Sequence, residues 1–135
     1  MEASKEDAMG SFEFIVLDVN DLGVSRTFYN AVLGRTPREL SPTFVSYELD
    51  SSLKLELCQR DSRIFPDALR PQGPVLGGGT ELCLSLPDDD SARRLCAQWS
   101  GWGARIVQEP GASVFGFTFV ALDPDGHRLR GVVGN

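Results

Sequence analysis

The sequence contains an internal repeat, and this repeat restricts the possible folds more than any other feature. The stretch Val19-Asn20-Asp21 recurs as Leu86-Pro87-Asp88 roughly 67 residues later, each time between an apolar run and a helix pattern. Further along, Leu55-Glu56 matches Leu129-Arg130 at an offset of about 74 residues. Small loop insertions account for the growing offset. We interpret the chain as two copies of one βαβββ unit; the alternative is a chance similarity between two α+β halves.

Each half begins with a strand pattern, continues with a helix pattern and ends in strands. The run Asp123-Pro124-Asp125-Gly126 predicts a tight hairpin, because proline presets φ and glycine accepts a positive φ. The predicted strands are 12–19, 43–49, 53–59, 80–86, 104–109, 115–122 and 127–133, and the predicted helices are 22–33 and 88–102.

The fold class predicted from these elements is α+β, with a single domain at 12–133. It consists of module one (12–59), a linker (60–79) and module two (80–133). The linker holds several prolines and glycines without periodicity, which is typical of a long loop. Residues 1–11 are predicted to form a polar N-terminal tail.

Composition excludes several classes of partner. The chain has 135 residues and a net charge of −6, without a cluster of Lys and Arg, so we expect no nucleic-acid partner. No apolar run approaches the ~20 residues of a membrane span, and the acidic start is unlike a signal peptide, so we expect no membrane partner. The odd number of cysteines disfavours a disulfide framework. These observations predict a cytoplasmic protein.

His127 is the only histidine, which excludes any site that needs two imidazoles from one chain. Because it follows the hairpin turn, we expect it to be solvated or to support the turn. Cys96, Trp99 and Trp102 share the apolar stripe of the second helix and are expected to pack in the core or at the rim of a ligand cup.

The repeat and its motifs resemble the vicinal-oxygen-chelate superfamily, which includes glyoxalase I, extradiol dioxygenases and bleomycin-resistance proteins. The motif residues are Val19-Asn20-Asp21, Ser25, Phe28-Tyr29 and Leu33-Gly34, with Val114-Phe115-Gly116 and Asp123 to His127 in the second half. Ser41 to Val45 and the closing run Glu109 to Arg130 resemble metal-free drug-binding members such as phenazine-antibiotic-resistance proteins. The resemblance implies cupped mixed sheets and a domain-swapped type of homodimer that encloses two ligand sites.

Metal-dependent members of this superfamily use four ligand positions, which correspond here to Phe14, Glu56, Glu81 and Arg130. A phenyl ring offers no lone pair, and a guanidinium stays protonated and repels a cation. Two carboxylates without an imidazole suit Zn²⁺, Ni²⁺ and Fe²⁺ poorly. We therefore expect neither a metal nor another cofactor.

The side chains that line the cup follow from strand alternation, with the four metal positions taken as facing inward. On the last strand, Arg130 is expected opposite Val120, and matching Phe44 to Phe117 makes Val45 and Tyr47 the counterparts of Thr118 and Val120. The predicted ligand-binding residues are Phe14, Val16, Val45, Tyr47, Glu56, Cys58, Glu81, Cys83, Thr118, Val120 and Arg130.

A cup with aromatic, aliphatic and charged walls suits a flat, largely apolar molecule that carries one or two polar groups. The leading hypothesis is metal-independent binding and sequestration of a small, planar, aromatic, antibiotic-like compound, in resistance or as a biosynthetic carrier, with no catalytic residue. One alternative is an enzyme, either a divergent lyase or isomerase that uses Glu56 or Glu81 as a base, or a dioxygenase-like member with an unconventional metal. Another is a regulatory dimer whose cup is vestigial.

Overall fold

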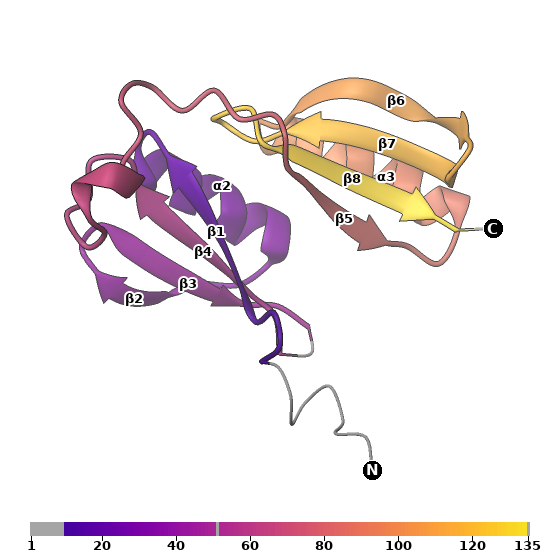
Figure 1. Cartoon of the computed structure of the whole chain (residues 1–135). Helices are drawn as coiled ribbons and strands as arrows, with labels where there is room; N and C mark the ends of the chain where they lie inside the picture. The colour runs from indigo at the N-terminus through magenta and orange to yellow at the C-terminus, as the bar shows by residue number, and fades with distance from the viewer. Residues whose placement is uncertain (1–9, 51, 135) are drawn as a thin grey trace, which may run out of the picture.

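Two sheets, each covered by a helix on one face, make up the computed structural model, which describes residues 10–50 and 52–134 (Figure 1). Most of the predicted tail at 1–11 lies outside the described residues. The strands are β1 (Phe14–Val19), β2 (Arg38–Ser41), β3 (Phe44–Glu48), β4 (Lys54–Gln59), β5 (Glu81–Ser85), β6 (Arg105–Ser113), β7 (Gly116–Leu122) and β8 (Arg128–Val133), and the helices are α2 (Leu22–Leu33), the short 3-10 helix η1 (Asp67–Leu69) and α3 (Asp89–Gly101).

The two sheets have the same topology. Their strand orders are β1-β4-β3-β2 and β5-β8-β7-β6. In each sheet the first strand pairs in parallel with the last, and the other pairs are antiparallel. This arrangement confirms the predicted α+β class and the repeated βαβββ pattern.

Both helices begin at an aspartate that caps the first turn. The Asp21 carboxylate accepts a hydrogen bond from the Val24 amide at 3.1 Å, and the Asp88 carboxylate accepts one from Ser91 at 2.7 Å. Each cap satisfies an amide that the first helical turn leaves without a partner. Gly34 ends α2 in the left-handed conformation, with φ of 65°, as the sequence predicted.

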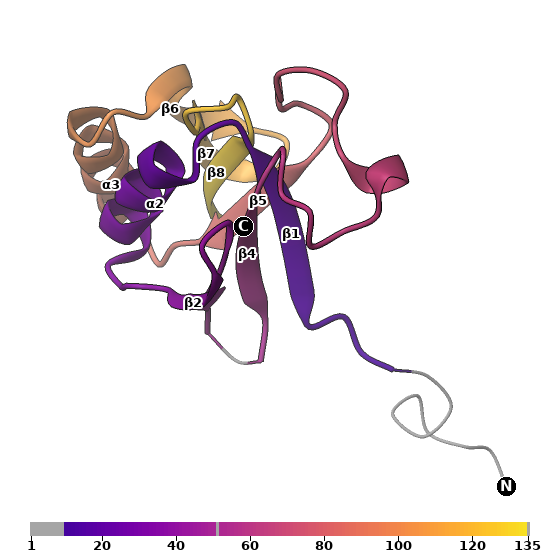
Figure 2. The same cartoon turned by 90° about the vertical axis from the view of Figure 1, so that its left-hand side faces the viewer.

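The core lies between the sheets and the two helices. Figure 2 shows α2 and α3 together on one side of the sheets, which leaves the opposite sheet faces open. The Trp99 and Phe119 rings pack edge to face at 5.3 Å in this core, and Cys96 is also buried there. Trp102 lies at the end of α3 and is 45% exposed. Within the described residues, no helix is long and apolar enough to cross a membrane.

Two strand predictions were incomplete. Arg38–Ser41 forms the edge strand β2, although its polar sequence carries no strand signal. Strand β6 does not end at residue 109 but continues to Ser113, past Pro110 and Gly111. Its pairing with β7 shifts register between Gln108 and Gly111, and such an irregularity on an edge strand accommodates a proline.

Candidate functional site: the open faces of the two sheets

The open face of the first sheet carries the predicted side chains of β1 and β4. Phe14 is paired in register with Lys54, Val16 with Glu56, and Leu17 with Leu57. Leu17 and Leu57 lie in the core, so Phe14, Val16 and Glu56 lie on the opposite, open face. Cys58 shares this face and is buried.

The placement of Val45 and Tyr47 was wrong. Strand β3 pairs Val45 with Leu57 and Tyr47 with Leu55, so both side chains lie on the core face, where each is fully buried. The Tyr47 hydroxyl donates to Asn30 Oδ1 of α2 at 2.7 Å, and burial raises its pKa to about 12. Tyr47 therefore ties the sheet to its helix and does not line a cup.

The error came from the alignment of the two repeats. Ser46 is paired with Glu56, and Val120 with Arg130, so Ser46 is the true counterpart of Val120. Matching Phe44 with Phe117 shifted β3 by one residue, and such a shift turns every side chain to the other face. The open face at β3 is therefore formed by Phe44 and Ser46.

In the second sheet, β7 and β8 pair in the predicted register. Val120 is opposite Arg130, and Cys83 is paired with Arg130 across β5 and β8. The Arg130 guanidinium donates to both carboxylate oxygens of Glu81, at 2.7 and 3.3 Å, and to Thr118 Oγ1 at 3.1 Å. The charged side chains at the base, or floor, of the open face of module two are Glu81 and Arg130, and they are already paired with each other.

Two phenylalanine rings lie over cations on these open faces. The Lys54 ammonium lies 5.0 Å from the centroid of the Phe14 ring, and the Arg130 guanidinium lies 5.3 Å from that of Phe115. The rings remain 53% and 62% exposed, respectively. Phe115 was not among the predicted ligand-binding residues, although it belongs to the Val114-Phe115-Gly116 motif. Each open face therefore presents an aromatic ring that is fixed by a charged group beneath it.

The floor of module one, in contrast, contains a buried hydroxyl without a partner among the described residues. Ser46 and Glu56 are only 6% and 7% exposed. The buried Ser46 hydroxyl makes no hydrogen bond to any described residue. A buried polar group without a partner is costly, so this pair is suited to a donor or acceptor from outside the chain.

The four positions that hold metal in related enzymes do not fit a metal here. Phe14 offers no donor atom, and Lys54 lies over its ring. Arg130 occupies the Glu81 carboxylate through two hydrogen bonds. Only Glu56 is left as a ligand, and one carboxylate does not hold a catalytic divalent ion.

A separate cluster of potential ligands, Asp123, Asp125 and His127, joins the two modules. Asp123 Oδ1 accepts the amides of Asp125 and His127, both at 2.9 Å, and its Oδ2 accepts the Tyr29 hydroxyl at 2.6 Å. The Asp125 carboxylate accepts from Ser25 at 3.2 Å. Because these oxygens already hold donors, the cluster is a buried structural network and a poor cation site.

Asn20 extends this network to the linker. Its side-chain amide donates to Asp125 at 2.7 Å and to the Val75 carbonyl at 2.9 Å, and its carbonyl accepts the Val75 amide at 2.6 Å. The His127 side chain is buried, not solvated, and it bonds through Nε2 to the Asp18 carbonyl of β1 at 2.8 Å, not to its own turn as expected. The residues that carried the family resemblance are thus the ones that hold module one, module two and the linker together.

The three cysteines have no activated thiol in this structure. Burial raises the pKa of the Cys58, Cys83 and Cys96 thiols, and the neighbouring Glu81 carboxylate raises that of Cys83 further. A thiol with a raised pKa is a weak nucleophile at neutral pH. Cys58 and Cys83 are therefore available only as wall groups of the open faces.

We expect the Glu81–Arg130 pair to make stability depend on pH. The Arg130 hydrogen bonds hold the pKa of Glu81 below its usual value. A carboxyl with a depressed pKa in the folded state stabilises the protein above the pKa of the unfolded state, and this stabilisation is lost as pH falls through the folded value. Arg130→Met should therefore lower the urea midpoint at pH 7, and the difference from the wild type should shrink toward pH 3. An equal difference at both pH values would show that the pair contributes nothing.

Comparisons with known proteins were made for the whole chain. A family model described as the Glyoxalase/Bleomycin resistance protein/Dioxygenase superfamily matches residues 11–130. The phenazine antibiotic resistance protein EhpR of Enterobacter agglomerans is 24% identical over 115 residues, which make up 83% of each chain. A protein from Agrobacterium tumefaciens, solved by solution NMR, has a TM-score of 0.81 and 36% identity over 94% of this chain and 99% of its own. A glyoxalase-related enzyme from Fulvimarina pelagi has a TM-score of 0.80 at 19% identity, covers 93% of this chain and 89% of its own, and shows the shared fold alone.

Proposed function

The chain belongs to the glyoxalase/bleomycin resistance/dioxygenase superfamily, and on this basis we propose that it binds and sequesters a small, planar, aromatic, antibiotic-like compound without a metal ion. The observation that carries the proposal is the pair of exposed phenyl rings, each lying over a cation on an open sheet face. Stacking on such a ring favours a flat aromatic ligand of any substitution pattern. The relative named for resistance to a phenazine antibiotic supports the same ligand class.

The proposal includes a homodimer. Small-molecule ligands are usually buried over most of their surface. A single open sheet face with exposed rings covers only one side of such a ligand. A second copy would cover the apolar side chains of Phe14, Val16 and Phe115, which are exposed in the single chain. We expect an interface well above the ~1,600 Å² of a standard complex, with two ligand sites per dimer.

Phe115→Ala is the sharpest test of this function. Removing a stacked ring should weaken binding of phenazine, used as the probe, by up to about tenfold, since aromatic stacking contributes roughly 0.5–1.5 kcal/mol. Because Phe115 is exposed in the single chain, the circular dichroism spectrum of the folded chain should stay unchanged, whatever happens to the dimer. Isothermal titration calorimetry measures the affinity, and its stoichiometry should give one phenazine per chain.

Val114→Ala is the matched control, because Val114 is 89% exposed and directly precedes Phe115. It should leave phenazine affinity at the wild-type value. If the wild-type protein binds no phenazine at millimolar concentration, or if both variants bind it equally well, the open face of module two is not the ligand site.

One observation favours a catalytic alternative. Glu56 is buried and accepts no hydrogen bond from a described side chain, which leaves its carboxylate available as a general base. The other candidate base, Glu81, is already held by Arg130. Product analysis of the compound recovered after binding distinguishes the two functions, because sequestration returns it unchanged and lyase or isomerase activity does not.

A further inference from the structure

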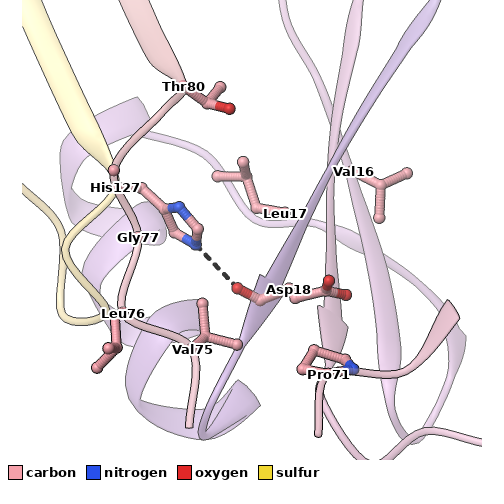
Figure 3. A pocket seen from close by; sticks show the side chains of 10 residues that line it. Val16, Leu17, Asp18, Pro71, Val75, Leu76, Gly77, Thr80 and His127 are labelled. Carbon is pink, nitrogen blue, oxygen red and sulfur yellow. Dashed lines mark hydrogen bonds between the residues drawn. The ribbon is translucent and has the colours of Figure 1, made fainter. Parts of the chain in front are cut away.

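A pocket lies between the two modules, beside the open face of module one, with which it shares Val16. It has a volume of about 320 Å³, which is in the range of small-molecule sites. The open edge of β1 forms one wall with Val16 and Asp18, and the linker forms another with Val75 and Leu76. His127, immediately before β8, and Thr80 are also in the lining (Figure 3).

The polar group that marks this pocket is the imidazole of His127. Its Nε2 lies 2.8 Å from the Asp18 carbonyl oxygen, which can only accept, so Nε2 carries the proton. In the neutral ring Nδ1 is then an acceptor. His127 is only 8% exposed, and Nδ1 has no hydrogen-bond partner among the described residues. Figure 3 shows this second nitrogen on the side of the ring that faces Thr80 and Leu17.

The linker wall of the pocket is fixed before any ligand arrives. Two hydrogen bonds join Val75 to the Asn20 side chain, and the Gly78 amide donates to the Gly126 carbonyl at 3.2 Å. A wall held on both sides costs little conformational entropy on binding. The pocket therefore combines a rigid, largely apolar lining with one buried acceptor that no described residue satisfies.

We propose that this inter-module pocket is a second small-molecule site, which takes a compact ring compound carrying an O–H or N–H group that donates to His127 Nδ1. The unpaired His127 Nδ1 accepts a hydrogen bond, so a donor on the ligand is required to satisfy it, and the Thr80 hydroxyl in the same lining can donate or accept. The apolar walls from β1 and the linker accommodate the ring. This inference does not depend on what the open faces bind.

Phenol and anisole form a pair of probes, since O-methylation removes the donor that the site requires and adds only one methyl group. Because His127 is the only histidine, its imidazole nitrogens give an unambiguous ¹⁵N NMR signal in the whole protein. We expect phenol to shift the Nδ1 resonance with a dissociation constant on the order of 1 mM. Anisole should bind at least tenfold more weakly.

Thr80→Phe tests the location. Thr80 is exposed and lines the pocket, so a phenyl ring there should fill the cavity, leave the melting temperature unchanged and abolish the phenol shift. Phe115→Ala, which alters only the open face of module two, should leave the phenol shift intact. An unshifted Nδ1 resonance, equal binding of anisole, or undiminished binding by Thr80→Phe would each overturn the proposal, whatever phenazine binding shows.

Discussion

Asp123→Ala should remove about 3–5 kcal/mol from the free energy of unfolding, the largest loss we expect from truncating a single polar side chain outside the apolar core. The Asp123 carboxylate accepts the Tyr29 hydroxyl and the amides of Asp125 and His127. Alanine leaves all three donors without a partner in a buried region, and each buried orphan costs roughly 1–3 kcal/mol. Since a domain is stable by only about 5–15 kcal/mol, the variant should be close to unfolding at 37 °C.

Urea denaturation followed by circular dichroism measures this loss. Asp123→Asn should lose less, because its amide oxygen still accepts one or two of the three donors. Asp89→Ala is the matched control, since Asp89 is an exposed aspartate in the first turn of α3. It should cost no more than about 1 kcal/mol, through its weak interaction with the helix dipole. Equal losses at the two positions would mean that the Asp123 network does not join the modules.

The fold could be predicted because local signals and the repeat agreed. Asp21, Asp88 and Gly34 mark helix ends by the chemistry of their own side chains and backbones, and the structure uses all three in this way. The hairpin before β8 was equally local, because Gly126 takes φ of 89° next to a proline-containing turn. These signals depend only on residues that are neighbours in the sequence.

The open faces could be predicted only where an anchor fixed the register. In module two the hairpin length determined that Val120 faces Arg130, and this pairing was correct. In module one the register of β3 rested on a match between two phenylalanines, and a one-residue error placed Val45 and Tyr47 on the wrong face. Side-chain alternation spreads one such error along a whole strand.

The inter-module contacts could not be predicted, because they join residues that are far apart in the sequence. Asn20, Ser25 and Tyr29 were visible as motif residues, and so were Asp123 and Asp125. Nothing in their spacing shows that Tyr29 donates to Asp123, or that Asn20 holds the linker at Val75. Reciprocal polar motifs in the two halves of a duplicated chain are the only signal that could have suggested such a network.

Gly77→Ala should be as damaging as the loss of Asp123, although it adds only one methyl group. Gly77 has φ of +66°, and a Cβ at this position would overlap the backbone carbonyl of Gly126. The left-handed conformation alone costs an L-residue roughly 1–2 kcal/mol. The overlap is with backbone rather than with a flexible side chain, so the linker must leave the hairpin, and the total loss should reach about 3–5 kcal/mol.

Gly78→Ala separates the cost of the left-handed conformation from the cost of the overlap with Gly126. Gly78 has a similar φ of +78°, but a Cβ there would meet only open space. It should show the conformational cost alone, and the difference between the two variants in urea denaturation measures the close approach of linker and hairpin. Limited proteolysis within 70–80 should accelerate in Gly77→Ala only, since the released linker becomes accessible. Equal stability of the two variants would mean that the linker does not pack against Gly126, and the inter-module pocket would then lack its preformed wall.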